Sequence, residues 1–473
     1  MSLNGFKFLV LFIALFLVLF FLQILRKFTH KKGFERAQIW LLLLFSFYFV
    51  AASDIRFLIS IIVTAAISYS CGILIKKYSD NGSIFLIGGG VALICILGYF
   101  KYTNFFIESI DSVFNLDFAT RDIILPLGIS FYTFSALAYL IDVYRGDYEP
   151  EKNVINFFMY ICFFSKVTAG PIVRGKEFFP QVHDYKGISK SGFEEGIQIF
   201  CFGLFKKMVI ADHLGVFVDD VFHAPVAFNT GTVIWAALSY SLQIYFDFSG
   251  YSDMAIGLSK ICGFDFSANF NLPYIATDVS DFWKRWHISL SSWLKDYLYI
   301  PLGGSRKGET RTYLNLLIVM FVSGLWHGAG WTFILWGVLY GVWNCIHQAL
   351  NKHSLIVPKA IAVPCTFVIV SLLWVIFRAT SFGNAAAMFK GMFTAHTGIS
   401  QPYTWTFFAV AVLVIAEIMA WRKAKKAGIT EVNGYYPVMN LSKFWNLIIF
   451  FTFIGLTIIL GYYGNTAFIY GKF

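Results

Sequence analysis

Charged side chains are scarce in this chain. Asp, Glu, Lys and Arg make up 14% of its 473 residues, whereas hydrophobic residues make up 58%. A soluble fold of that composition could not cover its apolar surface with polar groups, so the composition excludes an ordinary soluble protein and indicates a polytopic membrane protein. No internal repeat, low-complexity tail or soluble domain is visible in the sequence. We therefore predict an all-α membrane protein in which residues 1–473 form a single membrane-embedded domain.

Several common chemical signatures are also missing. The seven cysteines show no CxxC pair and no metal-ligand spacing, so neither disulfides nor a zinc site is expected. The chain contains no Walker A loop, HExxH or GxSxG motif. Neither His287 nor His327 has an aspartate four or five residues later, which excludes the H-x4-D type of acyltransferase box.

Long apolar segments are what the sequence does contain. About a dozen of them approach the ~20 residues that a helix needs to cross a bilayer. They lie at 8–25, 37–52, 56–75, 83–101, 123–143, 195–216, 233–262, 312–327, 331–350, 361–378, 403–421 and 445–463. A further apolar run at 153–170 is short and ends at Gly170-Pro171, which predicts a re-entrant or interfacial segment that protein must bury.

The formal net charge of +10 reflects basic residues that gather in short loops. In a membrane protein such residues set topology, and they do not by themselves indicate nucleic-acid binding. If the basic loops at 26–36, 76–77, 174–190, 284–311 and 422–426 are cytosolic, the loops at 102–122 and 217–232 lie on the opposite side. The second of these carries Asp219 and Asp220, which fits that sidedness.

Residues 281–300 predict an amphipathic helix. Phe282, Trp286, Leu290, Trp293 and Tyr297 share one face at helical spacing, a pattern typical of the lipid–water boundary. The segment would then be an interfacial anchor. Arg285 and His287 among the aromatics, followed by Pro301-Leu-Gly-Gly304, favour a role beyond anchoring.

The segment 281–311 holds six basic and three acidic residues, a local charge of +3 on the expected cytosolic side. One interpretation is that this positive charge sets the topology of the chain and contacts anionic lipid. The other is a docking rim for a phosphate-bearing donor such as a coenzyme A thioester. For that rim we predict Lys284, Lys295, Arg306 and Lys307.

A histidine inside membrane-length apolar sequence is a functional-site hypothesis. His327 lies in Trp326-His-Gly-Ala-Gly-Trp331, where small residues interrupt the helix and expose backbone N–H groups that could face an oxyanion. A buried neutral imidazole can take a proton from a hydroxyl as a general base. The alternative is a histidine that only hydrogen-bonds between helices.

Carboxylates interrupt another apolar run. The stretch Tyr245-Phe-Asp247-Phe-Ser-Gly-Tyr-Ser-Asp253 places two of them inside a candidate span, where charges are costly unless they face a cavity or a partner. We expect a kinked helix that lines a cavity. A proton relay in a transporter or flippase is the competing interpretation, although no inverted repeat is visible.

Taken together, these stretches resemble the membrane-bound O-acyltransferase (MBOAT) family, in particular the bacterial branch that O-acetylates exported polysaccharides such as alginate and peptidoglycan. The matching stretches, between about Leu125 and Leu350, are Leu125–Tyr132, Ala169–Arg174, Phe178–Gln181, Gln243–Asp253, Asn269–Pro273, Phe282–Leu290 and Leu325–Trp331. The resemblance implies a bundle of about 11–12 transmembrane helices, with re-entrant and interfacial helices, around a central tunnel.

The resemblance also implies a site and its substrates. His327 takes the catalytic position and His287 the second active-site position. Trp326, Tyr245, Asp247, Arg174, Arg285 and Trp286 are the expected site-lining residues. We expect no metal and no permanently bound cofactor. Acetyl-CoA is the expected cytosolic donor, and an extracytoplasmic esterase-like partner would place acetyl groups on a polysaccharide outside the bacterial cytoplasmic membrane. An alternative with the same acyl-transfer chemistry is D-alanyl transfer to teichoic acid from a carrier-protein thioester. A further alternative is a non-catalytic scaffold.

Overall fold

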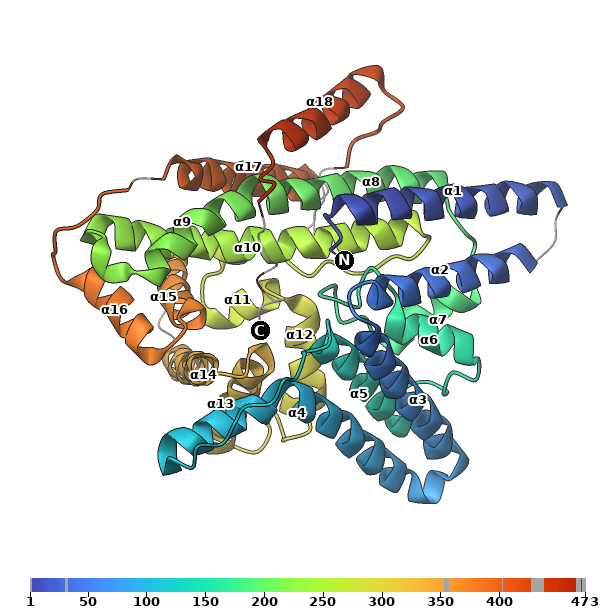
Figure 1. Cartoon of the computed structure of the whole chain (residues 1–473), viewed down its shortest axis with the longest axis horizontal. Coiled ribbons are helices and arrows are strands. Elements are labelled where there is room, and N and C mark those ends of the chain that lie inside the picture. Colours follow the sequence, from blue (N-terminus) through green and yellow to red (C-terminus); the bar gives the residue numbers. More distant parts are fainter. Residues whose placement is uncertain are drawn as a thin grey trace. The chain divides into compact units, whose positions relative to one another are not determined.

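The chain folds almost entirely into helices (Figure 1). The computed structural model describes residues 2–29, 33–352, 357–401, 403–426, 438–464 and 469. Within those ranges β-pairing is limited to an isolated bridge between Phe228 and Ile399. The predicted all-α class is confirmed. Part of the basic stretch at 26–36 lies outside the described residues.

The chain divides into two compact units. The first contains Met1–Phe200 and Asp253–Ser267, and the second contains Cys201–Ser252 and Ala268–Phe473. The prediction of a single domain stays a prediction. The helices of the first unit are α1 (Phe6–Thr29), α2 (Gly33–Ala51), α3 (Ile55–Lys77), α4 (Gly82–Phe114), α5 (Ile129–Arg145), α6 (Val154–Cys162), α7 (Gly175–His183) and most of α8 (Lys190–Phe205).

The second unit contains all of the predicted site except Arg174. Its helices are α9 (Asp212–His223), most of α10 (Thr230–Ile261), α11 (Val279–Arg285), α12 (Ile288–Leu294), α13 (Glu309–His327), α14 (Trp331–Lys352), α15 (Lys359–Arg378), α16 (Phe382–Phe393), α17 (Thr404–Lys426) and α18 (Phe444–Leu460). Short π-helical stretches at Lys206–Ala211 and Lys295–Tyr299 precede α9 and follow α12.

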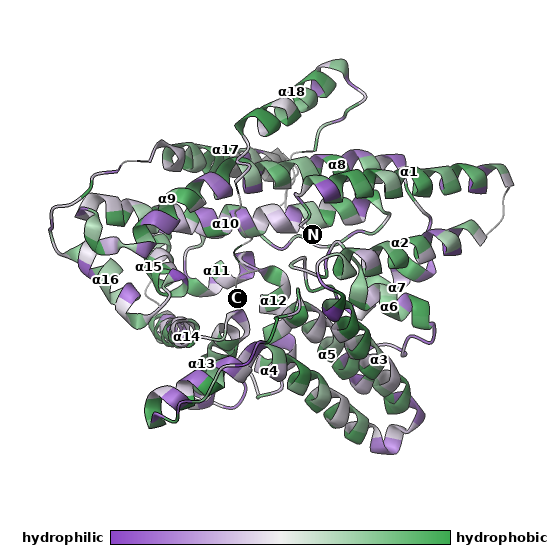
Figure 2. Cartoon of the chain, viewed as in Figure 1, coloured by the Kyte–Doolittle hydropathy of each residue, from purple (hydrophilic) through white to green (hydrophobic). Residues whose placement is uncertain are grey.

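Six described helices are long and apolar enough to cross a membrane: α1, α2, α3, α14, α15 and the helix Ser79–Phe114 that includes α4. Two shorter apolar stretches lie at Trp405–Ile415 and Phe444–Leu460. Hydrophobic residues cover most of α1 and α18 (Figure 2). These helices make the chain a multi-pass membrane protein; the larger predicted number of crossings stays a prediction.

Two predicted segments differ from the structure, and one helix was not predicted. The helix expected at 83–101 continues to Phe114, and the span expected at 195–216 is divided by the π-helical stretch at Lys206–Ala211. Helix α16 was not predicted, because its glycine- and alanine-rich sequence is not a long apolar run.

The short run that ends at Gly170-Pro171 behaves as irregular backbone enclosed by protein. Helix α6 ends at Cys162, and all residues from 163 to 174 are buried without forming a helix. Gly128, with φ +75°, lies directly against this segment, and a β-carbon there would come within 1.9 Å of the Val167 carbonyl oxygen. Non-helical backbone can exist at membrane depth where protein buries it in this way.

Helices α13 and α14 pack backbone against backbone. A β-carbon on Gly324 would lie 2.3 Å from the Phe333 carbonyl oxygen, and one on Gly337 would lie 2.3 Å from the Met320 carbonyl oxygen. Small residues allow such close approach between membrane helices. Because His327 is the last residue of α13, this contact positions the histidine.

Replacing Gly337 by alanine should therefore destabilise the protein, because the new methyl group meets rigid backbone. We expect a cost of about 1–3 kcal/mol, seen as a lower Tm of the purified protein. Gly88→Ala on α4 is the matched control, since a β-carbon there meets nothing within 4 Å. Equal Tm values for the two variants would contradict the backbone contact.

Candidate functional site

The segment expected to form one amphipathic helix is broken at its centre. Helix α11 ends at Arg285, Trp286 has extended backbone, and His287 has φ 44° and ψ 54° before α12 begins at Ile288. The prediction of a continuous interfacial helix was wrong. The five aromatic and aliphatic residues on its predicted face are nevertheless all buried inside the protein: Phe282, Trp286, Leu290, Trp293 and Tyr297.

The break is held by a segment that comes earlier in the chain. The backbone N–H of Ile288 donates to the Asn269 carbonyl oxygen at 2.9 Å, and the N–H of Asn271 donates to the Arg285 carbonyl oxygen at 2.8 Å. The Asn269 side-chain oxygen accepts from the backbone N–H of Ser289 at 3.1 Å and from its hydroxyl at 2.9 Å. A left-handed residue other than glycine costs roughly 1–3 kcal/mol and persists only where such contacts fix it.

Arg285 contributes to the same turn. Its Nε donates to the Asp281 carboxylate at 2.8 Å, and its Nη1 donates to the Asn271 carbonyl oxygen at 3.4 Å. Asp278 caps the start of α11 by accepting from the Asp281 N–H. The predicted site residue Arg285 therefore joins α11 to the earlier segment around Asn271.

His287 is completely buried, with an exposed fraction of 0%. Its Nδ1 lies 3.3 Å from the side-chain oxygen of Asn269, and its ring meets Phe248 edge-on at 4.7 Å between centroids. Because an amide oxygen only accepts, Nδ1 carries the hydrogen and the neutral ring has its acceptor at Nε2. His287 lies outside the six candidate spans, and burial lowers the pKa of its imidazole to about 3, which keeps the ring neutral.

His327 ends α13 as the sequence indicates. Gly328 has extended backbone, and α14 begins at Trp331, so the small residues do interrupt the helix. A β-carbon on Gly328 would collide with the Phe333 ring at 2.2 Å. The His327 side chain is 2% exposed and meets the rings of Trp336 and Phe377 edge-on, at 5.1 Å and 5.4 Å.

Trp326 connects the two histidines. Its ring centroid lies 5.7 Å from that of His287 and 5.0 Å from that of His327, and its side chain is 4% exposed. The two imidazoles are therefore separated by no more than the sum of these distances. Two histidines that are forty positions apart in the sequence thus contact the same indole.

A cluster of aromatic side chains surrounds this pair. The ring centroid of Trp336 lies 4.9 Å from that of Tyr340 and 5.7 Å from those of Trp283 and Trp374. The ring centroids of Trp286 and Trp374 are 5.0 Å apart. We call these five residues, with Trp326 and Phe377, the aromatic cluster. It is built by α11, α13, α14 and α15 together with Trp286.

Several polar atoms in or beside the aromatic cluster are buried and lack a hydrogen-bond partner among the described residues. They are the indole nitrogens of Trp283, Trp286 and Trp336 and the hydroxyls of Tyr340, Ser323 and Ser371. Buried polar groups are normally satisfied, and exceptions require an explanation. All of these groups are hydrogen-bond donors, and the ring of Trp336 lies directly against that of His327.

Tyr245 on α10 packs against other aromatic rings. Its ring centroid lies 5.9 Å from that of Phe270, 5.5 Å from that of Tyr274 and 6.2 Å from that of Trp286. The Tyr274 hydroxyl donates to the Ser241 carbonyl oxygen of the same helix. Tyr245 therefore supports the site through Trp286.

Asp247 participates in a buried ion cluster. Lys207 Nζ lies 2.6 Å from carboxylate oxygens of both Asp212 and Asp247, and all three side chains are at most 4% exposed. The second oxygen of Asp247 accepts the backbone N–H of Ile469 at 2.9 Å. Lys207 was missed by sequence reasoning, although a lysine within the apolar run at 195–216 with an aspartate five positions later was a readable signal.

The four predicted donor-binding cations, Lys284, Lys295, Arg306 and Lys307, are all exposed. That placement is compatible with a rim for an anionic ligand. Arg174 is buried in the first unit, where it is the residue directly before α7. Within the described part of the chain, no three His, Cys, Asp or Glu residues are grouped so that they could hold a metal ion.

The arrangement suits proton transfer in a dry environment. Two buried imidazoles flank one indole, and the tautomer of His287 is set by Asn269. Such a ring can accept a proton from a substrate hydroxyl, and buried N–H and O–H donors interact more strongly with developing negative charge than they would in water.

Replacing Asn269 by alanine removes the acceptor that holds the left-handed turn. We expect a loss of about 1–3 kcal/mol, because the Ser289 N–H and the His287 Nδ1–H lose their buried partner. Thermal unfolding of purified protein would measure it. Asn446→Ala removes an exposed amide that donates to the Asn440 carbonyl oxygen and should leave Tm nearly unchanged. If both substitutions lower Tm equally, Asn269 does not hold the turn.

Replacing Lys207 by methionine should be far more damaging, because two buried carboxylates would then face each other without a cation. We expect a loss of roughly 3–5 kcal/mol, with recovery when Asp212→Asn and Asp247→Asn are added. Lys76→Met is the control, since its ion pair with Glu149 is exposed and contributes about 0–1 kcal/mol. The measurements are the yield and Tm of the wild type, Lys207→Met, the triple variant and Lys76→Met. A triple variant as unstable as Lys207→Met would refute the charge explanation.

Comparison with known proteins shows the family of this chain. The model of the MBOAT, membrane-bound O-acyltransferase family matches residues 151–383, which include both histidines. A probable alginate O-acetylase of Pseudomonas aeruginosa is 41% identical over 400 residues, covering 82% of this chain and 74% of the relative. A peptidoglycan O-acetyltransferase of Helicobacter pylori is 37% identical over 414 residues, covering 81% of this chain and 78% of the relative.

A more distant relative, a teichoic acid D-alanyltransferase of Streptococcus thermophilus, is 30% identical over 254 residues, covering 50% of this chain and 60% of the relative. These relatives are transferases, which favours the enzymatic interpretation over a transporter, a flippase or a scaffold. The multi-pass helical fold, the match to the family model and the extent of the similarity lead to one conclusion: this chain is an O-acyltransferase of the membrane-bound O-acyltransferase family.

Proposed function

We propose that this chain transfers an acetyl group from cytosolic acetyl-CoA toward hydroxyls of an exported or cell-wall polysaccharide, across a bacterial cytoplasmic membrane. An extracytoplasmic esterase-like partner completes the transfer. The similarity to an alginate O-acetylase and to a peptidoglycan O-acetyltransferase supports the acetyl group and the glycan. The observation that carries the proposal is the pair of buried histidines whose rings both contact Trp326.

In this proposal His327 is the general base. It takes the proton of the attacking hydroxyl as the hydroxyl oxygen forms its bond to the thioester carbonyl carbon. The carbon–sulfur bond then breaks, coenzyme A leaves as the thiolate, and the thiolate takes a proton to become the thiol. The products are an acetyl ester and free coenzyme A.

His287 positions the reacting groups. With Nδ1–H engaged by Asn269, its Nε2 is the face that can accept a hydrogen bond from the substrate hydroxyl. The indole and hydroxyl donors of the aromatic cluster support the proposal because they could stabilise the tetrahedral oxyanion. Backbone N–H groups at Gly328–Gly330, where helix α13 ends, are further candidates for that role.

The exposed cations Lys284, Lys295, Arg306 and Lys307 are the proposed contacts of the donor's phosphates. Flexible exposed ammonium and guanidinium groups bind phosphate as charge partners, and such contacts weaken as salt rises. The alternative donor is a carrier-protein thioester of D-alanine, as the name of the streptococcal relative indicates for that protein. Its lower identity and smaller coverage favour the acetyl donor.

The central experiment replaces His327 by glutamine in the full-length protein. Glutamine keeps a polar side chain of similar size but cannot act as a base near neutral pH, so acetyl transfer should fall about a hundredfold or more. His183→Gln is the matched control, since His183 lies outside the proposed site, is half exposed and pairs with Glu151. Release of coenzyme A by purified protein and mass spectrometry of the exported glycan in complemented deletion strains provide the two measurements.

Wild-type turnover by a folded His327→Gln protein would remove this histidine from its role. A glycan that carries D-alanyl esters in place of acetyl esters would identify the carrier-protein reaction.

A further inference from the structure

A polar pocket of about 840 Å³ opens in the first unit, where α1 ends and α2 begins. Arg26 in the last turn of α1 lines it, together with Glu35 and Arg36 near the start of α2. Residues 182–186 and the beginning of α6 form the remaining walls. The basic loops at 26–36 and 174–190, which were expected on the same side of the membrane, therefore line one pocket.

Hydrogen bonds fix the walls of this pocket. Arg26 Nη1 donates to the Lys186 carbonyl oxygen at 2.6 Å, which joins the loop after α7 to α1. The Gln38 side-chain amide donates to the Leu19 carbonyl oxygen at 2.9 Å, which joins α2 to α1. Asn153 caps the start of α6 with its side-chain oxygen. The pocket is thus a built part of the first unit.

Most charged side chains that line the pocket are paired with an opposite charge. The pairs, with their N–O distances, are Arg26–Glu35 at 2.5 Å, Lys186–Asp184 at 3.1 Å and His183–Glu151 at 2.5 Å. Arg36 is exposed, and within the described part of the chain it has no ion-pair or hydrogen-bond partner. The pocket therefore keeps one guanidinium whose charge is not balanced.

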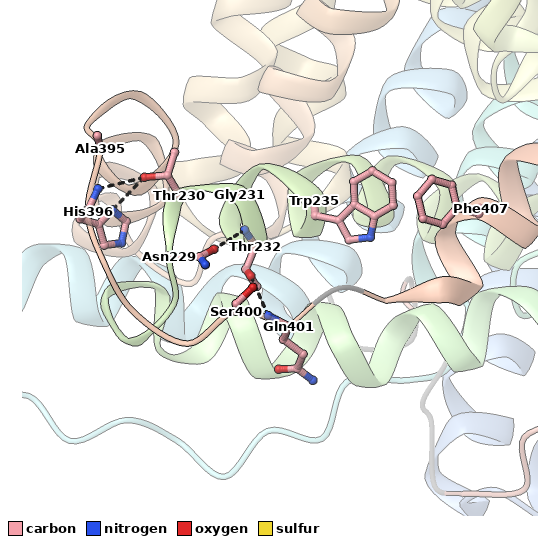
Figure 3. Close-up of a pocket in the computed structure, with 10 residues that line it drawn as sticks. All are labelled: Asn229, Thr230, Gly231, Thr232, Trp235, Ala395, His396, Ser400, Gln401 and Phe407. Atoms are coloured by element: carbon pink, nitrogen blue, oxygen red, sulfur yellow. Dashed lines mark hydrogen bonds between the residues drawn. The ribbon is translucent and has the colours of Figure 1, made fainter.

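A pocket of about 510 Å³ in the second unit offers a contrast (Figure 3). No lysine or arginine is among the described residues that line it. The hydroxyls of Thr230 and Thr232 and the side-chain oxygen of Asn229 already bind backbone groups of the protein. Of these two pockets, the one in the first unit is suited to an anion.

An exposed apolar ridge continues from Arg36 along α2. Trp40, Leu44 and Tyr48 follow at intervals of four residues, the spacing that aligns side chains into a ridge, and are 47%, 56% and 45% exposed. Trp40 also lines the pocket. From Arg36 to Tyr48 the helix rises about 18 Å, slightly more than half of the ~30 Å hydrocarbon core of a bilayer. An acyl chain that starts at the pocket would therefore follow this ridge through one leaflet.

We propose that this pocket binds the headgroup of an anionic phospholipid from the cytosolic leaflet. Arg36 contacts the phosphate, and an acyl chain lies along Trp40, Leu44 and Tyr48. Basic pockets at the cytosolic ends of transmembrane helices suit such headgroups, and a guanidinium can donate paired hydrogen bonds to a phosphate.

The surrounding charge favours an anionic lipid over a zwitterionic one. Residues 26–36 hold five basic residues and one acidic residue, a local charge of +4, which would repel the cationic end of a zwitterionic headgroup. A soluble anion would use Arg36 but would leave the ridge without a role. The inference does not depend on the proposed acetyl transfer.

Native mass spectrometry of the full-length protein in detergent tests the headgroup. The probes are dioleoyl-phosphatidylglycerol and dioleoyl-phosphatidylcholine, which share their acyl chains but differ in net charge. We expect wild-type protein to bind phosphatidylglycerol about tenfold more tightly, as a charge-assisted hydrogen bond allows. Arg36→Gln should abolish this preference. Arg422→Gln, which removes an exposed guanidinium of α17 from another loop expected to be cytosolic, should preserve it.

A second set of measurements distinguishes a lipid from a soluble anion. Leu44→Ala should weaken phosphatidylglycerol binding about threefold, because it removes apolar contact along the ridge. Leu17→Ala on α1 is the matched control, since Leu17 is 59% exposed and lies outside the pocket. Inorganic phosphate and coenzyme A should not displace the lipid.

Three results would overturn the lipid site. They are equal affinity of the wild type for the two lipids, a preference for phosphatidylglycerol that survives Arg36→Gln, and displacement of the lipid by inorganic phosphate or coenzyme A. Displacement would assign the pocket to a soluble anion.

Discussion

The turn at His287 depends on the side chain of Asn269. One amide oxygen accepts from the Ser289 backbone, the Ser289 hydroxyl and His287 Nδ1, while the Asn269 amide nitrogen donates to Ser252 on α10 at 3.3 Å. A single residue therefore links α10, the helix break and the imidazole. Without it, a histidine with φ 44° would have little reason to leave the helical conformation that the flanking residues adopt. The orientation of His287, and with it one side of the site, follows from this interaction.

The other side of the site is fixed by different means. His327 is held by its position at the end of α13, where helix packing through Gly324 and Gly337 leaves no freedom to slide. Its ring is then enclosed by Trp326, Trp336 and Phe377. One histidine is thus oriented by hydrogen bonds and the other by steric contact. Trp326 is where the two constraints meet, since its indole contacts both rings.

Much of this could be predicted from the sequence where the cause is local. The composition excludes a soluble fold, and the helix ends before Gly328 because glycine has a low helical propensity. The break at His287 could not be predicted in the same way, because its cause is Asn269, eighteen positions earlier and joined through backbone contacts that no periodic pattern reveals. The same holds for Lys207, whose carboxylate partner Asp247 lies on another helix.

For residues that were assigned to the site from their residue type alone, the structure gives different outcomes. Arg285 was expected at the site and stabilises the turn next to it, whereas Asp247 was expected to face a cavity and instead pairs with Lys207. Charge in an apolar run correctly marks a position as important, but it does not distinguish a substrate contact from an internal ion cluster. That distinction requires knowledge of the neighbouring helix.

The polar tips of the aromatic cluster have a consequence for selectivity. Trp283, Trp336 and Tyr340 place buried N–H and O–H groups in surroundings that are otherwise hydrocarbon. In the proposed mechanism, a guest bound against these groups would be discriminated only weakly from one that differs by a methylene, by a factor of about 10–200, whereas a guest that lacks a matching oxygen would be rejected by about 10⁴–10⁵. The length of the acyl chain would then be limited mainly by the available space. Substrate analogues that lack the matching oxygen would bind far more weakly than the substrate.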